Sequence, residues 1–332
     1  MTRWGPAQLV VTVVACTVVW AAVALGCLCV GSTEWGWPTG TTLHFRSESV
    51  LIASLVGAAL GGAGLTYQAV LRNPLADPYL LGLSSGASVG AVLVIVLGIG
   101  LVLPLAAFGG ALVALVATLA LAGAGWGAGA GGRAGSGGSL TPTRTVLAGL
   151  AVSAVFGAVT SLVIFWSATG DSYREILNWL LGSLAGTDWT SVAIAGGAML
   201  LVGLPLIASA RTLDAFAFGD TAAAALGVHV GRSRALLLGG TALLTGALVA
   251  VSGAIGFVGL ILPHAVSSLT GPAHRRLLPV SALAGAVFLI WADTIARTVF
   301  DPRELPVGIV TALVGVPVFA FLLRRGKGSA WT

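Results

Sequence analysis

Residues 57–93 read GAALGGAGLTYQAVLRNPLADPYLLGLSSGASVGAVL. Glycine recurs in this stretch at intervals of four, at Gly57 and Gly61 and again at Gly82, Gly86 and Gly90. A spacing of four places glycines on one face of an α-helix, where the absence of side chains lets two helix backbones approach closely. The stretch therefore predicts closely packed membrane helices on both sides of the polar sequence RNPLADP.

The composition of the whole chain also indicates membrane helices. The 332 residues include 16 Lys and Arg, 11 Asp and Glu and 57% hydrophobic residues, and the mean hydropathy is +1.02. Charged residues make up only 8% of the chain, whereas a soluble domain carries about 25% to keep its surface wetted. This composition excludes a soluble enzyme and a disordered chain and, because the basic residues form no clusters, a nucleic-acid-binding protein.

The apolar intervals between charged residues give the number of membrane spans, since a bilayer core takes about 20 apolar residues per helix. Two long intervals, 78–132 and 235–274, contain glycine-rich breaks and predict two spans each. Six further intervals predict one span each: 4–33, 49–71, 145–170, 189–210, 277–292 and 305–323. We therefore predict an all-α integral membrane protein with about ten transmembrane helices, in a single domain over residues 1–332.

Local sequence signals predict where two of the spans begin, and they also predict one helix that lies outside the spans. At Asp77-Pro78 a carboxylate that can cap a helix precedes a proline, which predicts the start of the third span. Pro306 gives the same signal for the tenth span. The segment Asp171–Asp188 is too short and polar to span, but its leucines and Ile176 share one helical face. We expect it to form a helix at the membrane interface.

Two connections on one side of the predicted bundle differ in character. Residues 123–139 are rich in glycine and predict a flexible cytoplasmic connector. Residues 211–234 form a longer loop in which Asp220 is expected to cap a short alanine-rich helix that ends at Gly227. A structured loop of this kind on a membrane protein suggests a docking site.

The distribution of positive charge predicts the orientation, because loops on the cytoplasmic side carry an excess of Lys and Arg. Ten spans place both termini on the same side, and twelve of the 16 basic residues fall on that side. The other four are Arg46, Arg174, Arg297 and Arg303. We therefore expect a multi-pass protein of the cell (inner) membrane with both termini in the cytoplasm.

Few residues in the spans suggest chemistry. Gly82-Leu83-Ser84-Ser85-Gly86 matches the G-x-S-x-G pattern of serine hydrolases, but no strand is expected before it and the histidines lack a convincing triad carboxylate. Asp293 and Arg297 are four residues apart in the ninth span and are expected to form an ion pair. Cys16, Cys27 and Cys29 are read as small apolar residues, and no metal site is predicted.

The fifth predicted span carries a stripe of small and hydroxyl-bearing residues. Its members recur at helical spacing: Thr145, Gly149, Ser153, Gly157, Thr160 and Ser161. Small polar side chains on one face of a membrane helix either pack against a neighbouring helix or line a polar path through the membrane. The sequence pattern by itself leaves both alternatives open.

Several motifs together resemble the membrane permeases of type II ABC importers for iron-siderophores, cobalamin and haem, the FecCD family. The resemblance covers about residues 45–325 and rests on blocks in the family order: Arg72-Asn73-Pro74-Leu75-Ala76-Asp77-Pro78, Gly256-Phe257-Val258-Gly259-Leu260, Pro263-His264, His274-Arg275-Arg276-Leu277-Leu278-Pro279, Ala292-Asp293-Thr294 and Glu304-Leu305-Pro306-Val307-Gly308.

This resemblance implies a permease subunit that works by alternating access. It implies two permease subunits, identical or related, around a central path, two cytoplasmic ABC ATPase subunits and an extracytoplasmic substrate-binding protein. ATP and Mg would be used by the ATPase subunits, so this chain is expected to bind no cofactor and not to be an enzyme itself.

The resemblance also implies roles for the site residues. The fifth helix lines the pathway in family members, which favours the pore-lining interpretation of the stripe from Thr145 to Ser161. The loop after the sixth helix docks on the ATPase, which implies a coupling role for Asp220, Leu226, Gly227 and Arg232. Arg46 and Arg297 correspond to arginines that meet the binding protein, although Ser49 stands where many members carry a second arginine, and Glu48 lies between them.

Three alternatives concern the cargo and the mechanism. Iron-siderophore complexes are the commonest cargo of the resembling family and are the expected substrate, with cobalamin and haem as alternatives. A secondary transporter would use the intramembrane Asp293 for ion coupling, although no inverted repeat is evident. An intramembrane hydrolase would use Ser84.

Overall fold

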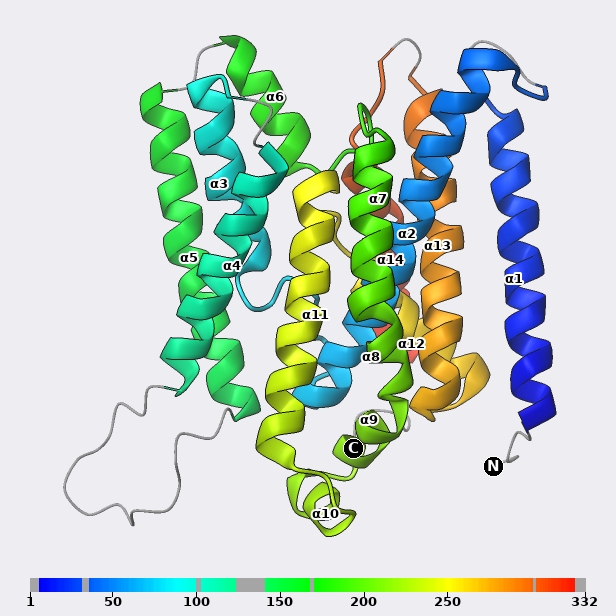
Figure 1. The fold of residues 1–332 in the computed structure, drawn as a ribbon, viewed down its shortest axis with the longest axis vertical. Helices are drawn as coiled ribbons and strands as arrows, with labels where there is room; N and C mark the ends of the chain where they lie inside the picture. The colour runs from blue at the N-terminus through cyan, green and yellow to red at the C-terminus, as the bar shows by residue number, and fades with distance from the viewer. Residues whose placement is uncertain are drawn as a thin grey trace.

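The structure, a computed structural model, describes residues 6–31, 36–99, 103–123, 141–167, 170–300 and 303–325. Over these ranges the chain forms helices and connecting segments, without a β-strand. The long helices run side by side along the longest axis of the molecule (Figure 1). Helix α6 (Gly170–Leu180) lies at one end of this bundle and helix α10 (Asp220–Ala225) at the other, and we call these the α6 end and the α10 end.

The remaining helices follow in chain order. They are α1 (Pro6–Cys29), α2 (Gly40–Leu71), α3 (Leu83–Leu97), α4 (Leu103–Gly123), α5 (Pro142–Ser167), α7 (Trp189–Ala198), α8 (Leu204–Ala208), α9 (Ala210–Ala217), α11 (Val230–Ser252), α12 (Val258–Thr270), α13 (His274–Thr298) and α14 (Val307–Arg325). A π-helical turn, Met199–Gly203, joins α7 to α8, so that these three segments form one continuous helix.

Seven helices of the described part of the chain are long and apolar enough to cross a membrane. They are Ala7–Cys29, Gly40–Leu71, Leu103–Gly123, Pro142–Ser167, Trp189–Ala208, Val230–Ser252 and His274–Thr298. Three shorter apolar helices accompany them: Leu83–Leu97, Val258–Thr270 and Val307–Leu322. The predicted all-α membrane class is confirmed, whereas the total of about ten crossings stays a prediction for the three short helices.

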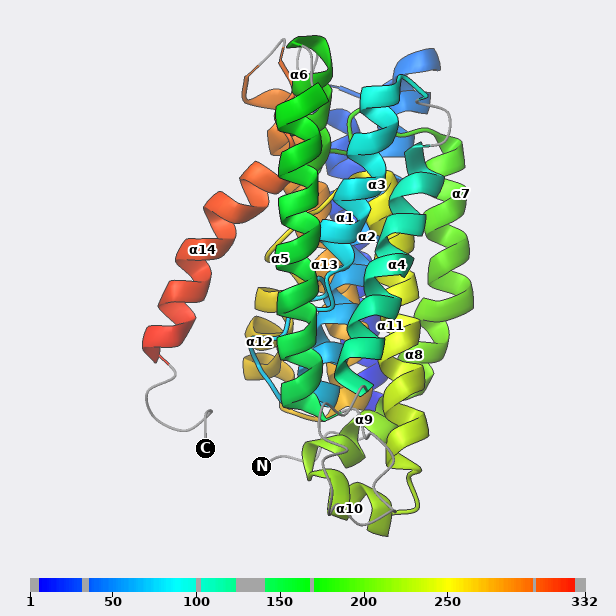
Figure 2. The ribbon, with the colours of Figure 1, turned by 90° about the vertical axis from the view of Figure 1, so that its left-hand side faces the viewer.

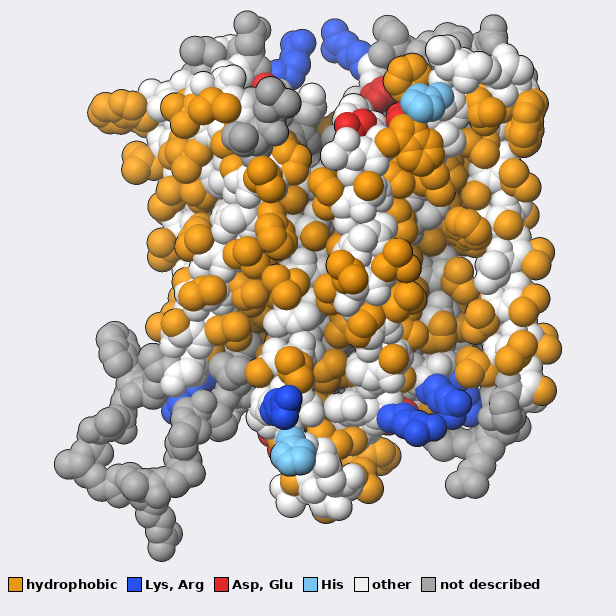
Figure 3. Space-filling view, viewed as in Figure 1, with side chains coloured by type: hydrophobic (Ala, Val, Ile, Leu, Met, Phe, Trp, Pro, Cys, Tyr) orange, Lys and Arg blue, Asp and Glu red, His pale blue; other side chains and the backbone are white. Residues whose placement is uncertain are grey.

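The surface has the distribution of side chains that a membrane protein requires. Hydrophobic side chains cover the middle of the molecule, and the charged side chains visible on this face gather at its two ends (Figure 3). A bilayer solvates the apolar middle and water solvates the ends. The molecule is therefore a membrane-embedded protein whose bundle axis crosses the bilayer.

The centre of the bundle is the contact between α2 and α13. Gly57 lies against the carbonyl of Gly285 and Gly61 against that of Ser281, so closely that a Cβ atom on either glycine would overlap with the facing backbone. Gly86 and Gly90 of α3 approach the backbone of α4 in the same way. The predicted close packing of these glycines is confirmed.

The start of the third helix differs from the prediction. Asp77-Pro78 does not begin it, because α3 starts at Leu83 after Gly82, whose φ is +80°. Instead the carboxylate of Asp77 accepts a hydrogen bond from the backbone N–H of Tyr79 at 2.8 Å and closes a turn. Residues 72–82 therefore form a non-helical segment that returns into the bundle before α3 begins.

Other predicted boundaries shift as well. The second span is not limited to residues 49–71, because α2 already begins at Gly40. The turns before residue 49 contain Glu48, which is buried. Its carboxylate lies 3.3 Å from the ring of His44 one turn earlier, and this contact offsets the cost of burying it. The tenth span starts as predicted, since α14 begins directly after Pro306.

The two predicted connections have different outcomes. The interfacial helix is present as α6, which ends at Leu180 and buries Ile176 against α3. In the loop 211–234, Asp220 is the first residue of α10 rather than its cap, and the helix ends at Ala225 before Gly227. Of the connector predicted at 123–139, Gly123 is the last residue of α4, and residues 124–139 lie outside the described residues.

Candidate functional site

A cavity of about 390 Å³ lies between α3 and α5. Its described lining is uncharged and rich in hydroxyl groups: Tyr79, Ser84, Ser85, Ser88, Ser153, Gly157, Thr160 and Leu180. Three members of the predicted α5 stripe, Ser153, Gly157 and Thr160, therefore face this cavity. Hydroxyl groups without charge can exchange hydrogen bonds with a passing solute and hold it only weakly.

The other three residues of the stripe have different surroundings. The hydroxyl of Thr145 is buried and donates to the carbonyl of Thr141 at 3.0 Å. Gly149 packs against the carbonyl of Leu80, where a Cβ atom has no room. Ser161 is exposed and donates to the carbonyl of Gly157 at 3.0 Å. The stripe thus packs at its start and borders a cavity in its middle, and its role in lining a path through the membrane stays a prediction.

Sequence reasoning missed the contribution of α3 to this cavity. Ser84 and Ser85 belong to the G-x-S-x-G pattern and Ser88 follows it, yet all three lie opposite the α5 residues in this cavity. Two histidine–carboxylate pairs are present in the described part of the chain, His44–Glu48 and His274–Asp214, and neither lines the cavity with Ser84. The geometry therefore gives Ser84 no triad partners.

The segment from α9 to α10 projects from the bundle (Figure 1). The Asp220 carboxylate and the Arg234 guanidinium of α11 form an ion pair, with Oδ1 and Nη2 2.6 Å apart. Arg234 is buried at 2% exposure, and its guanidinium lies over the ring of Phe216, 5.3 Å from the ring centroid. Asp220 therefore faces its own helix bundle, whereas Leu226 and Gly227 lie at the exposed tip and Arg232 is exposed in the first turn of α11.

A second contact ties α9 to α13. One carboxylate oxygen of Asp214 accepts the backbone N–H of His274 at 2.8 Å and lies 2.9 Å from its Nδ1. His274 is the first residue of α13, so Asp214 satisfies a backbone donor that the helix start leaves open. No sequence signal links residues 60 positions apart, and this contact was not predicted. The α9–α10 segment is thus held to α11 by an ion pair and to α13 by the contact of Asp214 with His274.

A smaller pocket of about 290 Å³ at the α6 end brings together both predicted docking arginines. Its lining includes Arg46, Arg297, Glu304 and Ser49. Arg46 donates from Nη1 to the carbonyl of Leu28 at 2.9 Å, and the Nε of Arg297 lies 2.9 Å from Oδ2 of Asp293. The predicted ion pair between Asp293 and Arg297 is confirmed.

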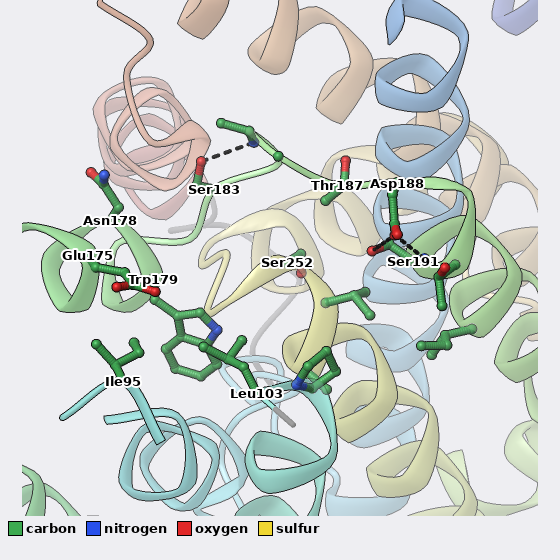
Figure 4. Close-up of a pocket in the computed structure, with 17 residues that line it drawn as sticks. Ile95, Leu103, Glu175, Asn178, Trp179, Ser183, Thr187, Asp188, Ser191 and Ser252 are labelled. Carbon is green, nitrogen blue, oxygen red and sulfur yellow. Dashed lines mark hydrogen bonds between the residues drawn. The ribbon is translucent and has the colours of Figure 1, made fainter. Parts of the chain in front are cut away.

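A further cavity, of about 650 Å³, opens at the α6 end between α6, α7 and α11. Trp179, Glu175 and Asn178 of α6 lie on one side of it, and Asp188 and Ser191 lie on the other (Figure 4). None of the predicted site residues lines it.

One of its acidic residues has a structural role. Asp188 caps α7, and the backbone and side-chain hydrogen bonds that it accepts from Ser191 lower the pKa of its carboxyl below the usual range. Its charge therefore stabilises a helix start at neutral pH.

Comparisons with known proteins agree with this architecture. The family model described as the FecCD transport family matches residues 9–325. The cobalamin import permease BtuC of Halobacterium salinarum is 43% identical over 84% of this chain and 72% of its own length. The Fe(3+) dicitrate permease FecD of Escherichia coli is 42% identical over 85% of both chains.

A solved structure, described as an inward-facing conformation of a metal-chelate type ABC transporter, has the same fold. It superimposes with a TM-score of 0.84 at 29% identity, and the match covers 95% of this chain and 99% of the other. This chain belongs to the FecCD transport family and is a membrane permease subunit of a type II ABC importer.

Proposed function

We propose that the chain is the permease of an importer for iron-siderophore complexes, working by alternating access. The observation that carries this proposal is the uncharged, hydroxyl-lined wall formed by α3 and α5 in a chain related to iron-chelate permeases. A large chelate can pass such a wall through weak, replaceable hydrogen bonds. Cobalamin is the second candidate, because the archaeal relative imports it; haem is the third cargo considered.

The path is expected to be completed by a second permease subunit, identical or related. Helix α5 also carries exposed apolar side chains, among them Leu147, Leu150, Val155 and Leu162. α14 leaves the bundle at an angle (Figure 2) and exposes Leu313, Val316 and Phe321. Two such subunits can enclose the hydroxyl-lined walls between them, with each apolar face covered by the partner or by lipid.

We place the α10 end in the cytoplasm, together with both termini. Arginines gather in the helix ends and connections there, including Arg72, Arg144, Arg211, Arg275 and Arg276. An excess of basic residues is the usual mark of the cytoplasmic side of an inner-membrane protein. The α6 end then faces the binding protein, and the pocket with Arg46 and Arg297 is the proposed docking site for its acidic side chains.

The α9–α10 segment is the proposed contact with the ATPase subunits. Phe218 and Leu226 are 76% and 68% exposed at its tip, and apolar side chains exposed outside the membrane favour a protein partner. The Asp220–Arg234 ion pair and the hydrogen bond from the His274 N–H to Asp214 support a rigid joint between this tip and the helices α11 and α13. Among the residues proposed for coupling, Leu226 and Gly227 would touch the partner, whereas Asp220 would hold the joint.

Uptake of a ferric siderophore, cobalamin and haemin in a deletion strain tests the cargo. We expect wild-type protein to restore ferric-siderophore uptake, and Leu226→Glu to restore less than about a tenth of it, because a carboxylate in an apolar contact weakens docking. Restoration of cobalamin uptake alone would replace the cargo. Trp37→Glu, at an equally exposed apolar residue of the α6 end, is the matched control.

Purification of the complex tests the coupling site separately. ATPase subunits are expected to co-purify with wild type and with Trp37→Glu and to be lost with Leu226→Glu at equal membrane abundance. Retention of the ATPase by Leu226→Glu would overturn the docking assignment. Uptake driven by an ion gradient in vesicles without ATPase subunits would instead support the secondary-transporter alternative.

A further inference from the structure

The connection between α11 and α12 is an irregular segment inside the bundle. Gly253, directly after α11, has φ +65° and ψ −168°, a conformation open essentially to glycine, and Phe257 has φ +70°. Because both ends of the segment leave the helical region, the residues between them have no helical hydrogen-bond ladder. Their backbone polar groups need other partners, and a protein interior at membrane depth offers little water to supply them.

The backbone N–H and carbonyl of Ile255, in the middle of this segment, both form hydrogen bonds with the side chain of Tyr79. The phenolic oxygen of Tyr79 accepts the Ile255 N–H at 3.1 Å, and its O–H donates to the Ile255 carbonyl at 3.0 Å. Ile255 is only 1% exposed. A single hydroxyl therefore satisfies a buried donor and a buried acceptor that lie 176 positions away in the chain.

Tyr79 also belongs to the wall of the hydroxyl-lined cavity. It lies in the non-helical segment 72–82, which leads into α3 and so into the part of the wall that holds Ser84, Ser85 and Ser88. The Tyr79 side chain thus stands between this cavity and the backbone of Ile255. It joins the segment before α3 to the connection between α11 and α12.

The same connection contacts two further elements. The carbonyl of Ser252 accepts the N–H of Ser183 at 2.9 Å, and the carbonyl of Gly182 accepts the N–H of Gly308 at 3.1 Å. Gly182 in turn packs against the backbone of Ala254. The residues 253–257 are thereby linked to the connection between α6 and α7 and to the start of α14, and we call this contact region the junction.

We propose that Tyr79 is a positioning residue for transport, which holds the cavity wall against the junction and keeps water from entering there. This role rests on the proposed importer function. In an alternating-access permease, ATP-driven movement at the α10 end has to move the cavity walls as units. Without the Tyr79 hydroxyl, the backbone N–H and carbonyl of Ile255 can form hydrogen bonds only with water from the cavity or after rearrangement of the junction. The junction then no longer moves together with the cavity wall, and ATPase-driven movement is not transmitted to the wall.

The chain supplies a matched control in Tyr67. This residue is 0% exposed on α2, and its hydroxyl oxygen has no hydrogen-bond partner in the described structure. Tyr67→Phe and Tyr79→Phe remove the same atom, the phenolic oxygen, in the first case from a fully buried tyrosine. Only Tyr79→Phe also removes hydrogen bonds. A comparison of the two variants therefore separates the effect of the hydrogen bonds from the effect of losing an oxygen atom.

The first measurement is hydrogen exchange at residues 253–257 in the assembled transporter in nanodiscs. We expect the Ile255 amide to exchange slowly in wild type and in Tyr67→Phe, and on the order of tenfold faster in Tyr79→Phe. Fast exchange in the wild-type protein would overturn the proposal without any variant. Equal exchange in the two variants would overturn it as well.

The second measurement is cargo uptake per ATP hydrolysed by the same complexes in proteoliposomes. For Tyr79→Phe we expect ATP hydrolysis close to wild type and uptake roughly fivefold lower, because the hydroxyl lies in the junction and not in the ATPase contact. Faster exchange with an unchanged ratio would overturn the transport role. Absence of ATP-driven uptake by wild type itself would contradict the importer function, and the exchange data would still decide whether Tyr79 holds the junction.

Discussion

At the scale of single residues, Arg234 is a buried cation that contacts the carboxylate of Asp220 and the ring of Phe216. Its partner Asp220 is 45% exposed, whereas the Arg234 side chain is 3% exposed. If Arg234 is removed, water can therefore solvate the Asp220 carboxylate. If Asp220 is removed, water cannot reach the buried Arg234 guanidinium. The contribution of the pair to stability is for this reason asymmetric.

The asymmetry gives a prediction for the two halves of the pair. Asp220→Ala, which takes the carboxylate away from a buried cation, is expected to lower the free energy of unfolding by about 3 kcal/mol, and Arg234→Met by clearly less. Thermal unfolding of the purified permease measures both, and the double variant shows the coupling between them. Equal losses for the two single variants would show that the buried charge does not set the cost.

At the scale of elements, the contact between α2 and α13 depends on glycines that leave no room for a side chain. Gly57→Ala is expected to destabilise the protein by about 1–3 kcal/mol, because the new methyl group overlaps with the Gly285 backbone. Gly62→Ala on the same helix meets no atom within 4 Å and is expected to be neutral or stabilising, since alanine favours a helix more than glycine does. Unfolding temperatures in one detergent compare the two, and a similar loss at both positions would refute the packing argument.

The same scale shows what the sequence could predict. Long apolar helices and the four-residue spacing of glycines are local patterns, so the class of fold and the close helix contacts follow from them. The sequence Asp77-Pro78 has every local sign of a helix start, but Tyr79 binds the backbone of a residue 176 positions later, and this tertiary contact outweighs the local signal. The α5 stripe was only partly interpretable, because small residues serve packing and cavity walls equally, and only the facing element decides between them.

At the scale of the whole molecule, the two ends carry different proposed contacts, so charge changes at one end can be tested without the other. Arg46→Glu is expected to slow association with the binding protein about tenfold at low salt, with a smaller effect at high salt, because charge steers encounter. Association kinetics with permease in nanodiscs measure this. Arg174→Glu makes the same charge change at an exposed residue of the α6 end outside the arginine pocket, and an equal effect there would mean that net charge alone matters.

The short helix α12 has a consequence for how the protein is made. Its 13 residues extend over about 20 Å, well short of the roughly 30 Å of a hydrocarbon core. A segment of this length has a weak tendency to leave the translocation channel for lipid by itself. During synthesis it depends on α13, which follows within a few residues, and on the earlier segment with Tyr79, which binds the backbone of the connection just before α12. The order in which the chain enters the membrane therefore differs from the order in which its helices become stable there.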